Sequence, residues 1–187
     1  NSSLDEVTKV PARIGRGFLF HIYTIPKSWH ICARVSTQAM YNVVVIGGGI
    51  VGLASALKIK EANPRYRVAV VEKEKAISRH QTGHNSGVIH SGLYYKPGSA
   101  KARNCVDGYN QLIKFCNEEG VNYELCGKIV VATSPEEVPY LHQLTERGIQ
   151  NGLTGMKKLS AGELKEYEPQ VNGGEGLFVP EAGNIDY

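Results

Sequence analysis

A glycine-rich turn between a short apolar run and a helical segment constrains the fold more than any other feature. Residues 43–46 read Val-Val-Val-Ile, a β-branched run typical of a strand buried on both faces of a parallel sheet. A turn at residues 47–52 follows, and apolar residues then recur at helical spacing up to Ile59. After a break at residues 63–64, a second apolar run ends at Glu72. This order predicts a βαβ unit of an α/β fold, with residues 43–46 as a central parallel strand.

The turn has the spacing G-x-G-x-x-G, and each of its three fixed glycines has a separate expected job. Gly47 allows the tight turn, Gly49 lets a pyrophosphate approach the helix N-terminus, and Gly52 lets the helix pack close to the sheet. Glu72 lies twenty residues beyond Gly52, where its carboxylate can accept hydrogen bonds from the ribose hydroxyls of an adenosine. These residues predict a dinucleotide site for an unphosphorylated ribose.

A polar loop at residues 80–92 follows the βαβ unit. It reads H-Q-T-G-H-N-S-G-V-I-H-S-G, which is too rich in glycine and short polar side chains for a regular element. Such a loop can lie along an extended ligand and hydrogen-bond it, so we expect it beside the cofactor. His90 near its end is a candidate proton acceptor, because imidazole titrates near neutral pH. A structural role for His90 stays open.

The rest of the chain predicts further helices and strands. Residues 99–119 have a helical pattern with a glycine after its end, and residues 121–133 favour one or two strands. Capping boxes at residues 134–137 and 160–163 each predict the start of a helix. A last short strand is expected at residues 177–179.

Charge and composition exclude several classes of protein. The formal net charge of the 187 residues is +3, but residues 41–187 carry 16 basic and 16 acidic side chains, so a nucleic-acid-binding surface is not indicated. The four cysteines form no C-x-x-C pair, so no metal site is predicted, and we interpret them as buried thiols. No apolar run reaches the roughly 20 residues of a transmembrane helix.

The first 40 residues differ in composition from the rest. They contain no acid after Glu6, scattered arginines and an apolar run at residues 18–25. This composition is typical of a mitochondrial presequence, so we interpret residues 1–40 as a leader. An interpretation as upstream sequence fits nearly as well, because the first methionine is Met40.

From about Tyr41 to Tyr187 the chain resembles the mitochondrial L-2-hydroxyglutarate dehydrogenases. The resemblance is carried by V-V-I-G-G-G-I-V-G-L-A-S-A, V-E-K-E-K, H-Q-T-G-H-N-S-G-V-I-H-S-G-L-Y-Y-K-P-G-S and G-N-I-D-Y. The glycine turn and the N-S-G-x-x-H loop are similar to those of FAD-dependent oxidoreductases of the D-amino-acid oxidase and glycerol-3-phosphate dehydrogenase type. The resemblance implies a Rossmann-like FAD-binding domain, a parallel sheet with flanking helices, and a mitochondrial location.

The resemblance also implies an activity and a set of site residues. The activity is oxidation of L-2-hydroxyglutarate to 2-oxoglutarate, with FAD as cofactor and electrons passed to an acceptor other than NAD. The residues that it places on the ADP half of FAD are Gly47, Gly49, Gly52 and Glu72. The residues that it places toward the pyrophosphate and the flavin are Thr82, Asn85, Ser86, Gly87 and His90.

Members of that family continue well beyond this length, with a sheet-based substrate domain. We therefore expect residues 41–187 to be the N-terminal part of an FAD-binding oxidoreductase domain that stops before most of the substrate domain, inactive by itself. Two alternatives stay open. The first is an FAD-dependent amine or amino-acid oxidase of the same fold, and the second is a non-catalytic, truncated nucleotide-binding fragment.

Overall fold

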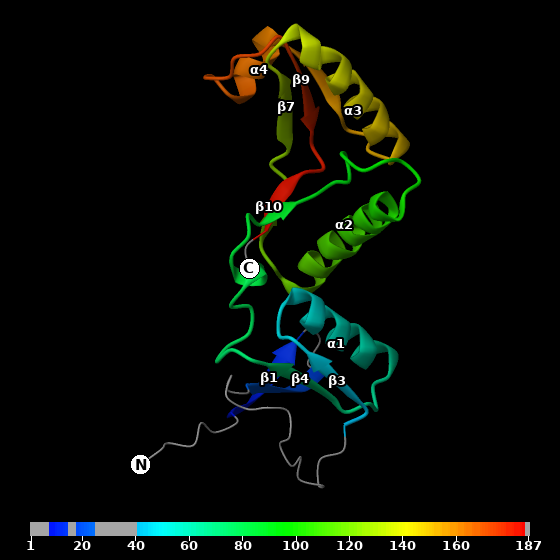
Figure 1. Ribbon diagram of the computed structural model, residues 1–187, viewed down its shortest axis with the longest axis vertical. Helices are drawn as coiled ribbons and strands as arrows, with labels where there is room; N and C mark the ends of the chain where they lie inside the picture. Colours follow the sequence, from blue (N-terminus) through cyan, green and yellow to red (C-terminus); the bar gives the residue numbers. More distant parts are fainter. Residues whose placement is uncertain (1–7, 15–17, 25–40, 186–187) are drawn as a thin grey trace. The chain divides into compact units, whose positions relative to one another are not determined.

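The computed structural model describes residues 8–14, 18–24 and 41–185 (Figure 1). The described residues form two compact units that divide between residues 86 and 87. The first unit carries the glycine-rich turn, and the second carries the segment from Gly87 onward. In the parts of the chain that the structure describes, no helix is both long and apolar enough to span a membrane.

The first unit is a four-stranded sheet with a helix packed on it (Figure 1). Its elements are β1 (Thr8–Ile14), β2 (Phe18–Thr24), β3 (Val43–Ile46), α1 (Ile50–Ala62), β4 (Val68–Glu72) and the short 3₁₀ helix η1 (Gln81–Gly83). The sheet order is β1-β2-β4-β3, with β4 parallel to β2 and β3. Ile22, Ala56, Val68 and Val70 form its buried core. The predicted βαβ unit and its parallel sheet are confirmed.

The described residues cover β3 less than expected for a central strand buried on both faces. Among the described strands β3 lies at one end of the sheet. Val43 and Val45 pack against the core, whereas Val44 and Ile46 are 53% and 84% exposed. In this unit α1 packs on the face of Val43 and Val45, and no other described helix packs on the sheet. The β-branched run indicates the element correctly, and the described strands pair with it on one side only, so its central place in the sheet stays a prediction.

The strands β1 and β2 lie within the segment that we interpret as a leader. They pair with each other in antiparallel register, and β2 pairs with β4 from His21 opposite Ala69 to Thr24 opposite Glu72. Residues 25–40 lie outside the described residues. The presequence interpretation therefore stays a prediction, and so does the domain boundary near residue 41.

The second unit contains a small sheet covered by a long helix. The sheet order is β5 (Val88–Ile89), β10 (Gly183–Ile185) and β6 (Tyr123–Glu124), all antiparallel. The helix α2 (Ala100–Glu119) contributes the buried Cys116 to a core shared with Ile89 and Ile185. As predicted, α2 begins after Ser99, whose hydroxyl accepts the Ala102 N–H, and ends at a left-handed Gly120.

A second sheet in this unit has the order β7 (Lys128–Ala132), β9 (Glu175–Val179), β8 (Lys157–Ser160), also antiparallel. The helix α3 (Val138–Gln150) packs on it around Leu141, Leu177 and Val179. The predicted capping box at residues 134–137 is wrong in detail. A 3₁₀ turn, η2 (Pro135–Glu137), precedes α3, and the Glu137 carboxylate accepts from the Thr133 N–H and hydroxyl at 2.7 and 2.8 Å.

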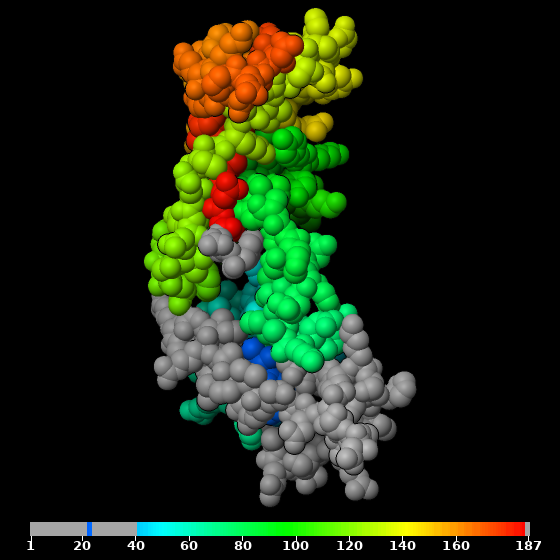
Figure 2. Space-filling model, turned by 90° about the vertical axis from the view of Figure 1, so that its left-hand side faces the viewer, coloured from blue at the N-terminus to red at the C-terminus, as the bar shows by residue number. Residues whose placement is uncertain are grey.

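The short helix α4 (Ala161–Tyr167) follows β8 and packs on the same sheet through the fully buried Leu164. The outer surface around α4 is orange in Figure 2. Its predicted capping box is confirmed, because Ser160 and Glu163 bond each other's backbone reciprocally. The hydrogen bond from the Ser160 N–H, together with Lys157 and the Ser160 hydroxyl, lowers the pKa of Glu163 from an ordinary 4.5 to about 2. The folded chain therefore favours the ionised carboxylate.

We expect this carboxylate to contribute to stability only above acidic pH. Since its folded pKa lies below the unfolded one, the contribution is complete above pH 4.5 and is lost as the pH falls from 4.5 toward about 2. Chemical denaturation across that window should show a smaller loss of stability for Glu163→Gln than for the parent. Glu166→Gln, on the exposed face of the same helix, is the control and should follow the parent. Identical pH profiles for Glu163→Gln and the parent would contradict the prediction.

Candidate cofactor site

The glycine-rich turn brings α1 into direct contact with the backbone of the preceding strand. Gly47 has a φ of +110°, a conformation that favours glycine, and its N–H donates to the Val71 carbonyl at 2.7 Å. A Cβ atom at Gly52 would lie 2.0 Å from the Gly47 carbonyl oxygen. The helix can begin at this place only because residue 52 has no side chain.

Replacement of Gly52 by alanine should therefore destabilise the protein by about 3 kcal/mol or more, the upper range for overpacking in a close-packed interior. The matched control is Gly162→Ala, also in the first turn of a helix, where an added Cβ meets nothing within 4 Å. Denaturant unfolding measures both effects. An unfolding free energy for Gly52→Ala equal to that of the control variant would show that the close approach does not exist in solution.

The N-terminus of α1 offers free backbone donors. Gly49 is its N-cap residue, and Thr82 of η1 accepts the Ile50 N–H on its hydroxyl at 3.0 Å. Among the described residues the N–H groups of Gly49 and Val51 have no hydrogen-bond partner, and the first turn contains no acidic residue. A helix N-terminus with free N–H groups attracts anions, including the phosphates of nucleotides. The space beside Gly49 fits such a group, because a Cβ there would meet only the Thr82 hydroxyl, at 3.3 Å.

Glu72 at the end of β4 is bound to the same turn. Its side chain is 8% exposed, and its two oxygens accept the N–H groups of Gly48 at 2.7 Å and Glu74 at 3.0 Å. Burial raises the pKa of Glu72, but the N–H donors of Glu74, Gly48 and Lys73 outweigh this effect and lower it overall. The carboxylate is therefore ionised at neutral pH. Since a carboxylate has about four acceptor positions, Glu72 can still accept hydrogen bonds from ribose hydroxyls.

The polar loop is held in place by its own side chains. The Asn85 amide donates to the carbonyls of Gln81 at 3.1 Å and Thr82 at 2.7 Å, which fixes the turn that carries Thr82. Ser78, at a left-handed φ of +61°, donates its N–H to the Gly48 carbonyl at 3.1 Å. Ser86 is exposed. Thr82 in the loop and Ser78 just before it thus both form hydrogen bonds with the glycine-rich turn and the start of α1.

Gly87 and His90 belong to the second unit. Gly87 has a φ of +64°, and a Cβ there would lie 2.7 Å from the Ile185 carbonyl oxygen, because the Ile185 N–H donates to the Gly87 carbonyl at 2.8 Å. This glycine is required by the approach of β10. His90 directly follows β5 and is exposed, and no described residue hydrogen-bonds its imidazole. Its carbonyl accepts from the Cys105 thiol at 3.4 Å.

The structure thus gathers part of the predicted set around the start of α1. The residues in contact there are Gly47, Gly49, Gly52 and Thr82, with Glu72 joined through Gly48. Sequence reasoning missed Gly48 and Ser78. Gly48 was the unassigned middle glycine of the turn, and no sequence signal marks Ser78. The prediction of buried cysteines is confirmed for Cys116 alone, because Cys105 is half-buried and Cys126 is exposed, while Cys32 lies outside the described residues.

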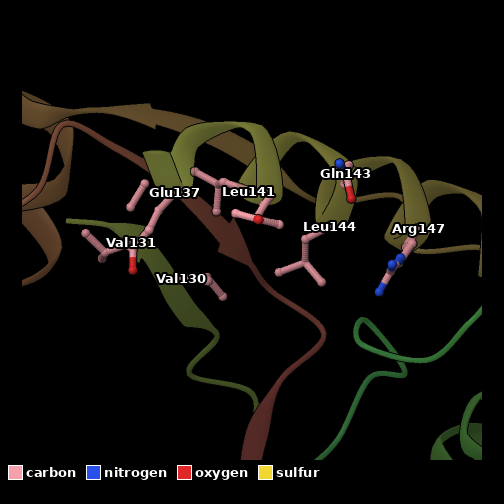
Figure 3. Close-up of a pocket in the computed structure, with 9 residues that line it drawn as sticks. Val130, Val131, Glu137, Leu141, Gln143, Leu144 and Arg147 are labelled. Atoms are coloured by element: carbon pink, nitrogen blue, oxygen red, sulfur yellow. The ribbon is translucent and has the colours of Figure 1, made fainter. Parts of the chain in front are cut away.

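A separate groove of about 420 Å³ lies in the second unit between β7 and α3. Figure 3 shows Leu141 and Leu144 extending from α3 beside Val130 of β7, with Glu137 near one end and Arg147 near the other. None of the predicted site residues lines this groove. Its lining is mainly apolar and contains no glycine-rich turn, so it does not have the features of a dinucleotide site.

Comparison with known proteins identifies the family. Residues 42–187 match the family of proteins described as FAD dependent oxidoreductase. This match covers most of the chain and includes the glycine-rich turn, Glu72 and the polar loop. The chain therefore belongs to the FAD dependent oxidoreductase family. The predicted cofactor class, FAD, is confirmed at the level of the family.

Individual relatives are similar over most of this chain. An L-2-hydroxyglutarate dehydrogenase from Indibacter alkaliphilus is 56% identical over 147 residues, which are 79% of this chain and 37% of the relative. A mitochondrial L-2-hydroxyglutarate dehydrogenase from Bos taurus is 45% identical over 163 residues, 86% of this chain and 35% of the relative. The chain spans about a third of the length of these curated relatives.

Solved structures are similar in fold. An L-alpha-glycerophosphate oxidase from Mycoplasma pneumoniae, solved with FAD bound, gives a TM-score of 0.73 at 27% identity, with 80% of this chain and 40% of that chain covered. A glycine oxidase from Geobacillus kaustophilus gives a TM-score of 0.66 at 22% identity, with 78% and 40% covered. These similarities confirm the predicted Rossmann-like α/β class of an FAD oxidoreductase.

Proposed function

We propose that this chain belongs to an enzyme that oxidises L-2-hydroxyglutarate to 2-oxoglutarate with FAD. The observation that carries the proposal is the 56% identity to a bacterial dehydrogenase of that name, together with 45% identity to a mitochondrial one. Both alignments include residues that form the start of α1 and the polar loop. The similarity to an oxidase of glycine supports the fold alone and does not favour an amino-acid substrate.

Different residues of this chain bind the cofactor and transfer the proton. The free N–H groups at Gly49 and Val51 hold the pyrophosphate of FAD, and Glu72 accepts from the adenosine ribose. Thr82 and Asn85 keep the polar loop against the start of α1, so that the loop continues along the cofactor. Bound FAD supplies the acceptor of two electrons from the substrate carbon.

His90 has three proposed roles. As a neutral imidazole it takes the proton from the 2-hydroxyl of the substrate while the substrate carbon is oxidised. Alternatively it contacts the flavin without a chemical role, or one of its ring nitrogens is bound covalently to the flavin. The exposed position of His90 after β5 and the absence of a described partner for its imidazole are compatible with all three.

We further propose that the electrons pass to an acceptor other than NAD and that the protein is mitochondrial. The location is supported by the animal relatives, which are named as mitochondrial, and by the acid-poor composition of residues 7–40. Identity alone does not carry the location, since the relative from Indibacter alkaliphilus is bacterial.

Anaerobic mixing of the FAD-loaded, full-length protein with L-2-hydroxyglutarate tests the function. The flavin absorbance should bleach and 2-oxoglutarate should form, whereas the D enantiomer should do neither and added NAD should not restore the flavin colour. Bleaching by an amino acid or amine in place of the hydroxy acid would favour the oxidase alternative. Bleaching by no substrate of either class would favour the non-catalytic alternative.

A further inference from the structure

Lys128, the first residue of β7, is a half-buried cation next to the core of the second unit. It pairs across the sheet with Val179, which is fully buried. Its ammonium nitrogen lies 4.4 Å from the centroid of the Tyr94 ring. Burial lowers the pKa of Lys128, an effect that the interaction with Cys105 only partly offsets. Most lysines keep their ammonium groups in water, so this position is unusual.

The cation has no acidic partner in the described parts of the chain. The lysine–glutamate ion pairs found there involve four other lysines, namely Lys58, Lys73, Lys114 and Lys157. No described carboxylate lies within ion-pair distance of Lys128, and the Tyr94 ring is its described electrostatic contact besides Cys105. A partly desolvated charge without a counter-charge costs free energy, and such groups are concentrated at sites that bind a ligand.

The surroundings of Lys128 include the segment that carries His90. Cys105 of α2 interacts with the charge of Lys128, and its thiol contacts the His90 carbonyl at 3.4 Å. Tyr94, four residues beyond His90, lies in a loop fixed by Asn151, whose amide donates to the carbonyls of Gly92 at 3.0 Å and Tyr95 at 2.9 Å. All of these residues belong to the second unit. Cys105 of α2 therefore interacts both with the charge of Lys128 and with the backbone of His90, the candidate base.

We propose that Lys128 determines specificity by binding a carboxylate of the substrate, with the Tyr94 ring holding the ammonium in place. This inference rests on the proposed function, whose substrate has two carboxylates. In this substrate two methylene groups separate the distant carboxylate from the carbon that bears the hydroxyl. If His90 contacts the hydroxyl, the residue that binds the distant carboxylate should therefore lie near His90 but not next to it. The carboxylate supplies the counter-charge that Lys128 lacks, in a partly desolvated place where a charge-assisted hydrogen bond is strong.

The main test compares two substrates in the FAD-loaded, full-length protein. Lys128→Met keeps most of the length of the side chain and removes the charge. It should raise KM for L-2-hydroxyglutarate by about 10- to 100-fold, the ratio equivalent to one charge-assisted hydrogen bond, with kcat within a few-fold of the parent. For L-2-hydroxybutyrate, which lacks the distant carboxylate, kcat/KM should not change. Lys158→Met, an exposed lysine of β8 in the same sheet, is the control and should leave both substrates unaffected.

A second variant leaves the charge in place. Tyr94→Leu removes the ring from the ammonium, and it should raise KM for L-2-hydroxyglutarate by a few-fold while kcat/KM for L-2-hydroxybutyrate stays constant. If Lys128→Met does not fold, the effects of Tyr94→Leu on the two substrates test the inference instead. Equal effects on the two substrates would overturn the inference.

Binding of glutarate, which has no hydroxyl to oxidise, separates this inference from the proposed function. Glutarate should raise the Tm of the parent and of Lys158→Met but not that of Lys128→Met. If the parent does not oxidise L-2-hydroxyglutarate but shows this pattern with glutarate, the proposed function is wrong and the dicarboxylate site stands. If the parent oxidises L-2-hydroxyglutarate and Lys128→Met matches it in KM, the site is wrong and the function stands. If the parent neither oxidises L-2-hydroxyglutarate nor binds glutarate, both the proposed function and the dicarboxylate site are wrong.

Discussion

A Gly49→Val variant of the full-length protein should fold normally and fail to retain FAD. The backbone at Gly49 has a φ of −82° and a ψ of 175°, which any residue can adopt. An added Cβ meets only the Thr82 hydroxyl, at 3.3 Å, so the substitution disturbs little of the protein itself. The valine methyl groups would instead fill the space in front of the free N–H groups of α1. We expect the affinity for FAD to fall by about two orders of magnitude or more.

The ratio of FAD to protein after desalting measures this effect, and circular dichroism confirms that the variant is folded. Gly174→Val is the matched control, because a Cβ at Gly174 meets nothing within 4 Å and the residue belongs to the second unit. The control should keep its FAD. Equal FAD content in the two variants would refute the assignment of the pyrophosphate to the start of α1.

Replacement of His90 by glutamine should lower kcat by about 10²-fold or more, the usual contribution of a general base, and leave the FAD content unchanged. Glutamine can still donate and accept hydrogen bonds, but it cannot take up a proton near neutral pH. The loop should survive the change, since His90 is exposed and the contact with Cys105 uses its backbone carbonyl. His84→Gln, in the same polar loop, is the control.

The other two proposed roles of His90 give different results in the same set of experiments. A non-covalent contact predicts that the variant turns over within a few-fold of the parent. A covalent link predicts that yellow colour stays with the parent protein after acid precipitation and is released from His90→Gln. A colourless precipitate of the parent, with turnover of the variant near that of the parent, would leave His90 as a contact residue only.

The βαβ unit could be predicted from the sequence because every signal for it is local. The strand, the turn and the helix follow one another within residues 43–62, and the need for glycine at residue 52 arises from the turn just before it. The capping box at Ser160 and Glu163 was predictable for the same reason, since it lies within one helical turn.

Features that depend on contacts between distant segments could not be predicted. The bond between Glu72 and the Gly48 N–H joins residues 24 positions apart, and nothing in either residue type selects it over a contact with solvent. The resemblance places Gly87 toward the cofactor, which stays a prediction, but nothing in the sequence indicates that its lack of a side chain is also required by the approach of β10, almost a hundred residues later.

The hydrogen bond from the Gly48 N–H to Glu72, together with the ribose contact that we propose for the same carboxylate, limits how the nucleotide preference of this protein could be re-engineered. In nicotinamide-binding proteins of this fold an acid at this place hydrogen-bonds the ribose 2′-OH, whereas a nearby arginine accommodates a 2′-phosphate, so a change of preference begins with removal of the acid. Here that removal would also leave the buried Gly48 N–H without its acceptor, at a cost of about 1–3 kcal/mol. A successful redesign would have to supply a replacement acceptor for Gly48 in the same step. A single substitution at residue 72 should therefore lower the stability of the protein, whatever its effect on the cofactor preference.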